Sequence, residues 1–100
     1  MASKKQYVIV RTYAMGVFAG ELEPESTETC KVLGNARRLW FWAGAASLSQ
    51  LAMEGTSEPK RCKFPVAVAR VELTSPQGFE VLTVTTAARE SIEAVPVWSA

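Results

Sequence analysis

A change from strand to helix is predicted within one segment, Trp40-Phe41-Trp42-Ala43-Gly44-Ala45-Ala46-Ser47-Leu48-Ser49-Gln50. Its two tryptophans lie two positions apart, so in an extended strand they would point to one face. Ser47 and Gln50 have the spacing of a capping box, in which the serine hydroxyl accepts the backbone N–H three residues later. We therefore expect a strand over residues 36–42 and a helix over residues 48–54. The alternative for residues 36–42 is a helix, because Ala, Arg and Leu are good helix formers.

Most of the remaining chain has the composition and alternation of β-strands. Further strands are expected over residues 7–13, 17–23, 29–33, 64–73 and 79–84. A turn at Gly16 would make the first two strands a hairpin, and a second turn is expected at Gly34-Asn35. The predicted fold class is therefore α+β: a small, mainly antiparallel β-sheet or partly open barrel of about six strands, with two short helices.

Both predicted helices have recognisable ends. Gly55 would end the first, since glycine readily takes the left-handed conformation found at helix C-termini. The second is expected over residues 87–94, with Thr86 as its cap and Pro96 stopping it. No repeat, low-complexity tract or linker divides the sequence, so residues 1–100 are expected to form a single domain.

The composition argues against several classes of activity. The chain has 100 residues, 48% of them hydrophobic, a formal charge of +1, no histidine and no aspartate. Ser-His-Asp triads, Cys-His nucleophile pairs and His-ligated metal sites are therefore absent from one chain, and we expect no cofactor and no metal. An enzyme using Glu, Arg, Tyr or Lys is less favoured but stays open. Cys30 and Cys62 lack the CxxC spacing and are interpreted as buried free thiols, with a disulfide as the alternative.

The charge balance and the N-terminal segment indicate where such a protein would act. The near-neutral charge lacks the basic footprint of duplex-binding proteins, so there is no strong nucleic-acid signal. No apolar run approaches the ~18 residues of a membrane span, and no signal-peptide pattern precedes the first strand. We therefore expect no membrane association and a cytoplasmic protein.

The first candidate site is the block formed by Arg37, Arg38, Trp40, Trp42 and Ser47. The arginines could bind a phosphate or carboxylate while a tryptophan stacks on a planar ring, beside the free N–H groups of the helix start. The alternative is that both tryptophans fill a small core and the arginines are solvated.

A second candidate site comes from the first predicted strand. Arg11 and Tyr13 are two positions apart and share a face, so they could join Arg38 in a polar pocket. The alternative is an ordinary exposed arginine at a strand end.

Several segments resemble a group of small uncharacterised proteins encoded by tailed bacteriophages and prophages. The resemblance covers nearly the whole chain, and its central stretch is the most specific part. It is carried by Arg11-Thr12-Tyr13, Gly16-Val17, Gly20, residues 36–52, Glu54-Gly55, Cys62-Lys63-Phe64, residues 71–74 and Val95-Pro96-Val97-Trp98. In that group a serine and often a histidine stand at the positions held here by Ala14 and Phe18, so a site that used those polar residues would be lost or altered in this chain. The resemblance implies the cytoplasm of a bacterial host, and it transfers no catalytic residue.

Together these observations favour a phage-encoded, non-enzymatic accessory protein that acts by binding. Self-association as a homo-oligomer is expected, because three tryptophans and a large apolar fraction in so short a chain can leave apolar surface uncovered. A host protein is a further candidate partner. Two alternatives remain: a module that binds or sequesters a nucleotide-like anionic small molecule, and a structural component of the phage particle.

Overall fold

The computed structural model describes residues 5–99 and shows an α+β fold built on one antiparallel sheet. Five strands lie in the order β4-β3-β2-β1-β5, all neighbours antiparallel. The elements are β1 (Tyr7–Thr12), β2 (Val17–Leu22), β3 (Cys30–Arg38), α1 (Leu48–Glu54), the 3-10 turn η1 (Pro59–Arg61), β4 (Val68–Thr74), β5 (Phe79–Thr83) and α2 (Thr86–Ala94). The predicted fold class is confirmed.

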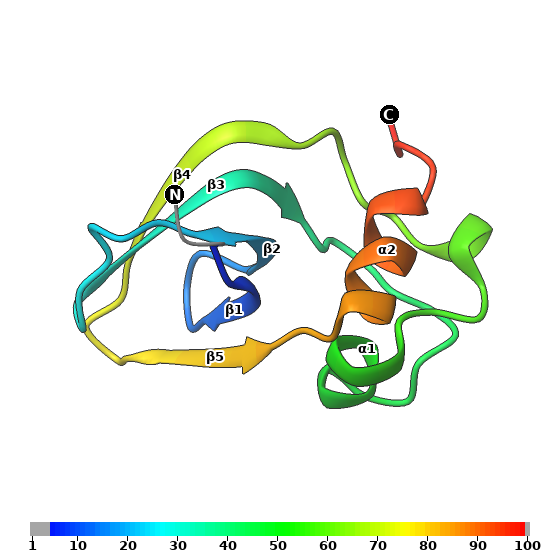
Figure 1. Ribbon diagram of the computed structural model, residues 1–100, viewed down its shortest axis with the longest axis horizontal. Helices are drawn as coiled ribbons and strands as arrows, with labels where there is room; N and C mark the ends of the chain where they lie inside the picture. Colours follow the sequence, from blue (N-terminus) through cyan, green and yellow to red (C-terminus); the bar gives the residue numbers. More distant parts are fainter. Residues whose placement is uncertain (1–4, 100) are drawn as a thin grey trace.

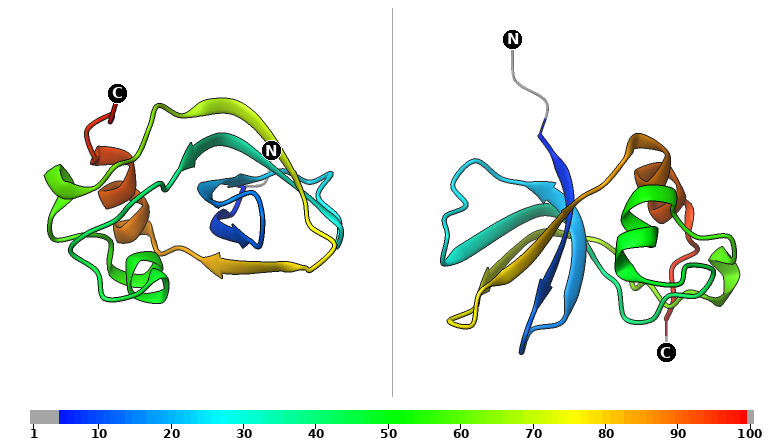
Figure 2. Two further views of the ribbon diagram at one scale, coloured as in Figure 1. Left: turned by 180° about the vertical axis from the view of Figure 1, so that it is seen from behind. Right: turned by 90° about the horizontal axis from the view of Figure 1, so that it is seen from below.

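The sheet is strongly curved, and the two helices lie together at one end of it (Figure 1). The edge strands β4 and β5 lie on opposite sides of the curved sheet, although a short turn joins them along the chain. Figure 2 shows from below that the fanned strands and the helical part form two separate groups. The sheet therefore keeps open edges, as a partly open barrel does.

Strand β1, which lies between β2 and β5, is buried on both faces, and this explains its continuous apolar run. Tyr7 and Ile9 point to the helical side, in a cluster with residues of both helices. Val8 and Val10 point to the inner side of the curve, in a cluster made only of strand residues. Residues 7–10 are each at most 6% exposed, so this segment is the centre of the core.

The predicted turn at Gly34-Asn35 is wrong, because these residues lie inside one long strand, β3. Asn35 has a φ of 49°, and the pairing of β3 with β2 shifts register opposite Ala19 and Glu21, which is a β-bulge. Two expected strands are therefore one bulged strand. Asparagine tolerates the left-handed conformation that the bulge requires, and the same tolerance made the pair resemble a turn.

Two strand boundaries were also predicted wrongly. β3 ends at Arg38, and the following residues leave the sheet instead of continuing to residue 42. β4 begins at Val68, not at residue 64. The segment before β4 contains Pro65, which cannot donate a backbone hydrogen bond to a sheet, and Phe64 instead forms an isolated bridge with Val97.

The helix ends agree closely with the sequence. Helix α1 covers the predicted residues, the Ser47 Oγ accepts from the Gln50 N–H at 3.1 Å, and Gly55 follows with a φ of 80°. The Gln50 side chain accepts from the Ala46 N–H instead of the Ser47 N–H, so the capping box is closed one residue earlier than expected. Helix α2 is capped by Thr85, one residue before the predicted Thr86.

Candidate functional site

The predicted arginine-tryptophan block is divided among three places in the fold. Arg37 and Arg38 are consecutive in β3, so their side chains leave opposite faces of the sheet. Trp40 lies beyond the strand and is 64% exposed, whereas Trp42 is partly buried against the helical core. The two tryptophans do not share a strand face, and the expected pocket of two arginines and two stacked rings is not formed.

Arg37 is buried on the helical side of β3, with only 6% of its surface exposed. Its guanidinium donates to three backbone carbonyls: Nε to Pro65 at 3.0 Å, Nη1 to Ile92 at 2.9 Å and Nη2 to Phe64 at 3.0 Å. It also lies 5.6 Å from the centre of the Phe64 ring. Burial lowers the pKa of this side chain. Arg37 therefore ties β3 to the segment before β4 and to the last turn of α2.

Arg38 lies on the inner side of the curved sheet and is only partly buried. Its guanidinium stacks 4.3 Å from the centre of the Phe18 ring and donates to the Met15 carbonyl at 3.0 Å. It borders the largest surface hollow described, of about 830 Å³, which we call the β4 groove. The residues that define it are Met15, Arg38, Trp40, Val66, Val68 and Glu72.

The remaining predicted site residues lie elsewhere. Ser47 caps α1, and its hydroxyl is occupied by the Gln50 N–H. Arg11 forms an ion pair with Glu80 at 3.0 Å, and Tyr13 is 82% exposed beyond the end of β1. Arg11 and Tyr13 border one hollow at the end of β1, but Arg38 does not join them. Arg11 pairs with Val17 and Arg38 with Phe18, so this register places the two arginines on opposite faces of the sheet.

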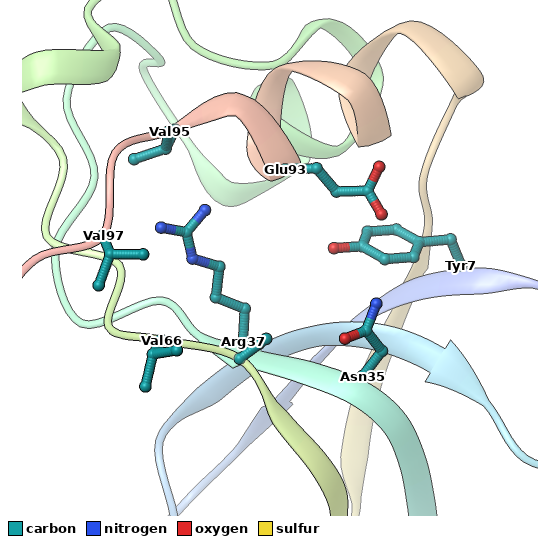
Figure 3. A pocket seen from close by; sticks show the side chains of 8 residues that line it. Tyr7, Asn35, Arg37, Val66, Glu93, Val95 and Val97 are labelled. Carbon is teal, nitrogen blue, oxygen red and sulfur yellow. The ribbon is translucent and has the colours of Figure 1, made fainter.

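A second hollow, of about 400 Å³, lies on the helical side of the sheet around Arg37, and we call it the Tyr7 cavity (Figure 3). Tyr7, Asn35 and Glu93 border it together with the apolar residues Val66, Val95 and Val97. Tyr7, Asn35 and Glu93 were not predicted as site residues. No local signal marks them, because they come from the first strand, a bulge and the last helix.

The Tyr7 side chain has an unusual environment for a tyrosine. It is 6% exposed, and burial together with the charge of Glu93 raises its pKa to about 12. The Arg89 guanidinium lies 4.5 Å from the centre of its ring and is itself bonded to Glu21 at 2.9 Å and Glu93 at 3.1 Å. The Tyr7 hydroxyl is therefore protonated at neutral pH and available as a hydrogen-bond donor.

Both cysteines are free in the structure; Cys62 is buried and Cys30 is partly exposed. The Cys62 sulfur accepts from the Ala43 N–H at 3.4 Å and lies 3.5 Å from the Ala43 carbonyl oxygen, so it packs the connection after β3. Within residues 5–99 no group of three or more Cys or Glu side chains is placed to hold a metal ion. Over the same residues, no helix has the length and apolar character needed to cross a membrane.

Residues 5–92 match a protein family described as "Domain of unknown function (DUF6948)". The chain belongs to this family. The matched range includes all five strands, helix α1 and the residues that define the β4 groove. No curated protein and no solved structure matches the chain.

Proposed function

We propose that this chain is a non-enzymatic binding protein of a bacteriophage or prophage, which acts in the host bacterial cytoplasm as a homodimer. The resemblance to small phage proteins supports the origin and the location. The single observation that carries the binding role is the β4 groove, because it gathers exposed apolar side chains around one arginine. Aromatic residues and arginine are the types enriched in the centres of protein interfaces.

The exposed apolar side chains of the groove are clustered in one place, unlike the isolated apolar residues found on most protein surfaces. Trp40 and Val66 are each 64% exposed, Val68 is 44% exposed and Met15 is 40% exposed, and all four border one hollow. Contiguous apolar surface of this kind on a small domain marks an interaction site. The groove therefore supports association with another macromolecule.

A second copy of this chain is the occupant that fits best, because one wall of the groove is an open sheet edge. β4 ends the sheet, and within residues 5–99 no strand pairs with its outer side. Such an edge is a template for pairing with another strand. Val68 and Glu72 belong both to β4 and to the groove, so a strand added to this edge would lie beside the groove.

The charges along β4 are complementary to themselves. If two copies of β4 pair antiparallel about a two-fold axis at Val71, Arg70 lies opposite Glu72 of the partner subunit, and the reverse pair forms by symmetry. Opposite charges in facing positions stabilise a pair of strands, whereas like charges destabilise it. Arg70 and Glu72 are both exposed; within one chain Arg70 binds Glu72 at 3.1 Å and Glu25 at 2.7 Å, so pairing with a partner subunit would exchange or extend these exposed ion pairs.

Sedimentation equilibrium over a wide concentration range tests the proposal. We expect a mass twice the 10.9 kDa of one chain. Arg70→Glu should dissociate the dimer, because it places like charges opposite each other. Combining Arg70→Glu with Glu72→Arg should restore it, because both facing pairs regain opposite charges.

Arg61→Glu is the matched control, since Arg61 is also an exposed arginine paired with a glutamate, on η1 and away from β4. It should leave the dimer intact. A mass of one chain at every concentration would contradict the homodimer. Failure of the double reversal to restore association would contradict the two-fold pairing at Val71.

A further inference from the structure

The Tyr7 cavity contains a buried positive charge that no carboxylate touches. All three hydrogen bonds recorded for Arg37 end on neutral backbone carbonyls, and within residues 5–99 no carboxylate oxygen lies within ion-pair distance of it. Burying a charge is costly unless an opposite charge or enough hydrogen bonds compensate it. A guanidinium has five N–H groups, so two of those on Arg37 remain for another acceptor.

The same cavity holds a second donor without an acceptor. Tyr7 is more than nine-tenths buried, and among residues 5–99 its hydroxyl has no hydrogen-bond partner. Figure 3 shows this hydroxyl pointing into the space on the side of Arg37, with the Asn35 side chain beside it. The hydroxyl is not fully enclosed, because it borders the cavity and water can reach it there. It is therefore free to donate to a molecule bound in the cavity.

The shape and lining of the cavity restrict what that partner can be. Val66, Val95 and Val97 line the side next to Arg37, so part of any bound molecule meets apolar surface (Figure 3). The volume of about 400 Å³ lies near the lower end of small-molecule pockets, which run from about 300 to 1,000 Å³. The space is therefore that of a small-molecule site.

We propose that the Tyr7 cavity binds a small carboxylate that carries an apolar group. One carboxylate accepts from the free N–H groups of Arg37 and from the Tyr7 hydroxyl, while its apolar group packs on the valines. Glu93 also borders the cavity, and Arg89 offsets only part of its charge because Arg89 is shared with Glu21. The bound carboxylate therefore lies on the Arg37 side of the cavity, away from Glu93 (Figure 3). Charge-assisted hydrogen bonds from arginine to a carboxylate are among the strongest in proteins. The cavity shares Val66 with the β4 groove, but its polar groups on Tyr7 and Arg37 lie on the other face of the sheet, so its test is independent of the homodimer.

Nuclear magnetic resonance titration of the complete protein with valerate tests this proposal. Saturable shifts are expected at the Arg37 Nε–H and at the Ala67 backbone amide, because both residues line the cavity. Valeramide has nearly the same shape without the charge and should not produce them. The dipeptide acetyl-alanyl-valine presents the same chemistry as a chain terminus: tighter binding of valerate identifies a small acid, and tighter binding of the dipeptide identifies a peptide end.

The variant Tyr7→Phe isolates the hydroxyl group. Since this hydroxyl bonds to nothing in the described chain, the variant should fold normally, and its melting temperature without ligand checks that. It should bind valerate at least about tenfold more weakly, the loss expected for a hydrogen bond to a charged group. Tyr13→Phe changes the exposed tyrosine and should bind like the unaltered protein. Equal binding of valerate and valeramide, no saturable binding, or unchanged affinity in Tyr7→Phe would overturn the proposal.

Discussion

Replacing Arg37 by methionine should destabilise the protein far more than the same change at its neighbour Arg38. Methionine has a similar length but donates no hydrogen bond, so all three hydrogen bonds from Arg37 to backbone carbonyls are lost. The Phe64 carbonyl keeps the Trp98 N–H as a donor, whereas within residues 5–99 the Pro65 carbonyl has no other donor. The Ile92 carbonyl belongs to the last turn of α2 and keeps the Val95 N–H as a donor. The change therefore loosens the connection between the sheet, the segment before β4 and the end of α2.

The expected loss follows from the contacts. Each of the three lost hydrogen bonds contributes about 1 kcal/mol to stability, because water can enter through the adjoining cavity and replace part of it. The three together cost about 3 kcal/mol. Removing a buried charge returns part of its desolvation cost. Losing the contact with the Phe64 ring, 5.6 Å away, costs a similar amount, so these two effects offset each other. We therefore expect a decrease of about 3 kcal/mol in the free energy of unfolding.

Arg38→Met is the matched control, because Arg38 is partly exposed and donates to one carbonyl, on Met15. Losing that bond and the stacking on Phe18 should cost about 1 kcal/mol. Urea unfolding followed by tryptophan fluorescence measures both variants, provided that the dependence of free energy on urea keeps the same slope. A loss for Arg37→Met no greater than that for Arg38→Met would refute the reasoning.

Two further changes test the pKa of Tyr7 and the cap of α1. The folded-state pKa of Tyr7, about 12, exceeds its ordinary value of 10, so its contribution to stability is complete below pH 10 and is lost as the pH rises through 12. The difference between these two pKa values corresponds to about 2–3 kcal/mol of stability. When urea unfolding is measured at pH 10 and at pH 12, Tyr7→Phe should therefore lose about this much less stability between the two pH values than the unaltered protein. Equal losses in the two proteins would contradict the burial argument. Ser47→Ala should cost about 1 kcal/mol in the same assay at neutral pH, because the N–H of Gln50 loses its acceptor. Ser49→Ala, an exposed change inside the helix, should be neutral or slightly stabilising, and an equal loss in both variants would argue against the cap.

The fold class and the helix ends were predictable from the sequence because they depend on local chemistry. The cap at Ser47 and the stop at Gly55 need only a hydroxyl, a glycine and their spacing, and both were confirmed. The hairpin of β1 and β2 around Gly16 was confirmed for the same reason. Period-two patterning was enough to indicate a mainly antiparallel sheet, since alternation is a property of the strand itself.

At Gly34-Asn35 the local sequence is compatible with two structures, a turn and a bulge. A residue with positive φ can reverse the chain or insert an extra residue into a strand, and the sequence is the same in both cases. The neighbouring strands decide between them: here β3 pairs with β2 and β4 on both sides of Asn35. The merging of two expected strands therefore depended on tertiary pairing.

The candidate sites depended on the tertiary structure almost entirely. The sequence by itself singled out Arg37 and Arg38, but the sheet separates them, one under α2 and the other in the β4 groove. Tyr7 carried no local sign of a site, because Glu93 and the carbonyl partners of Arg37 approach it only after the chain has folded. A residue's own type and spacing determine its secondary structure, whereas burial, charge and free hydrogen-bonding groups are set by neighbours distant in the chain. For this reason the sequence determined the fold class and the helix ends of this protein, whereas the length of β3 depended on strand pairing and the Tyr7 cavity on the packing of α2 against the curved sheet.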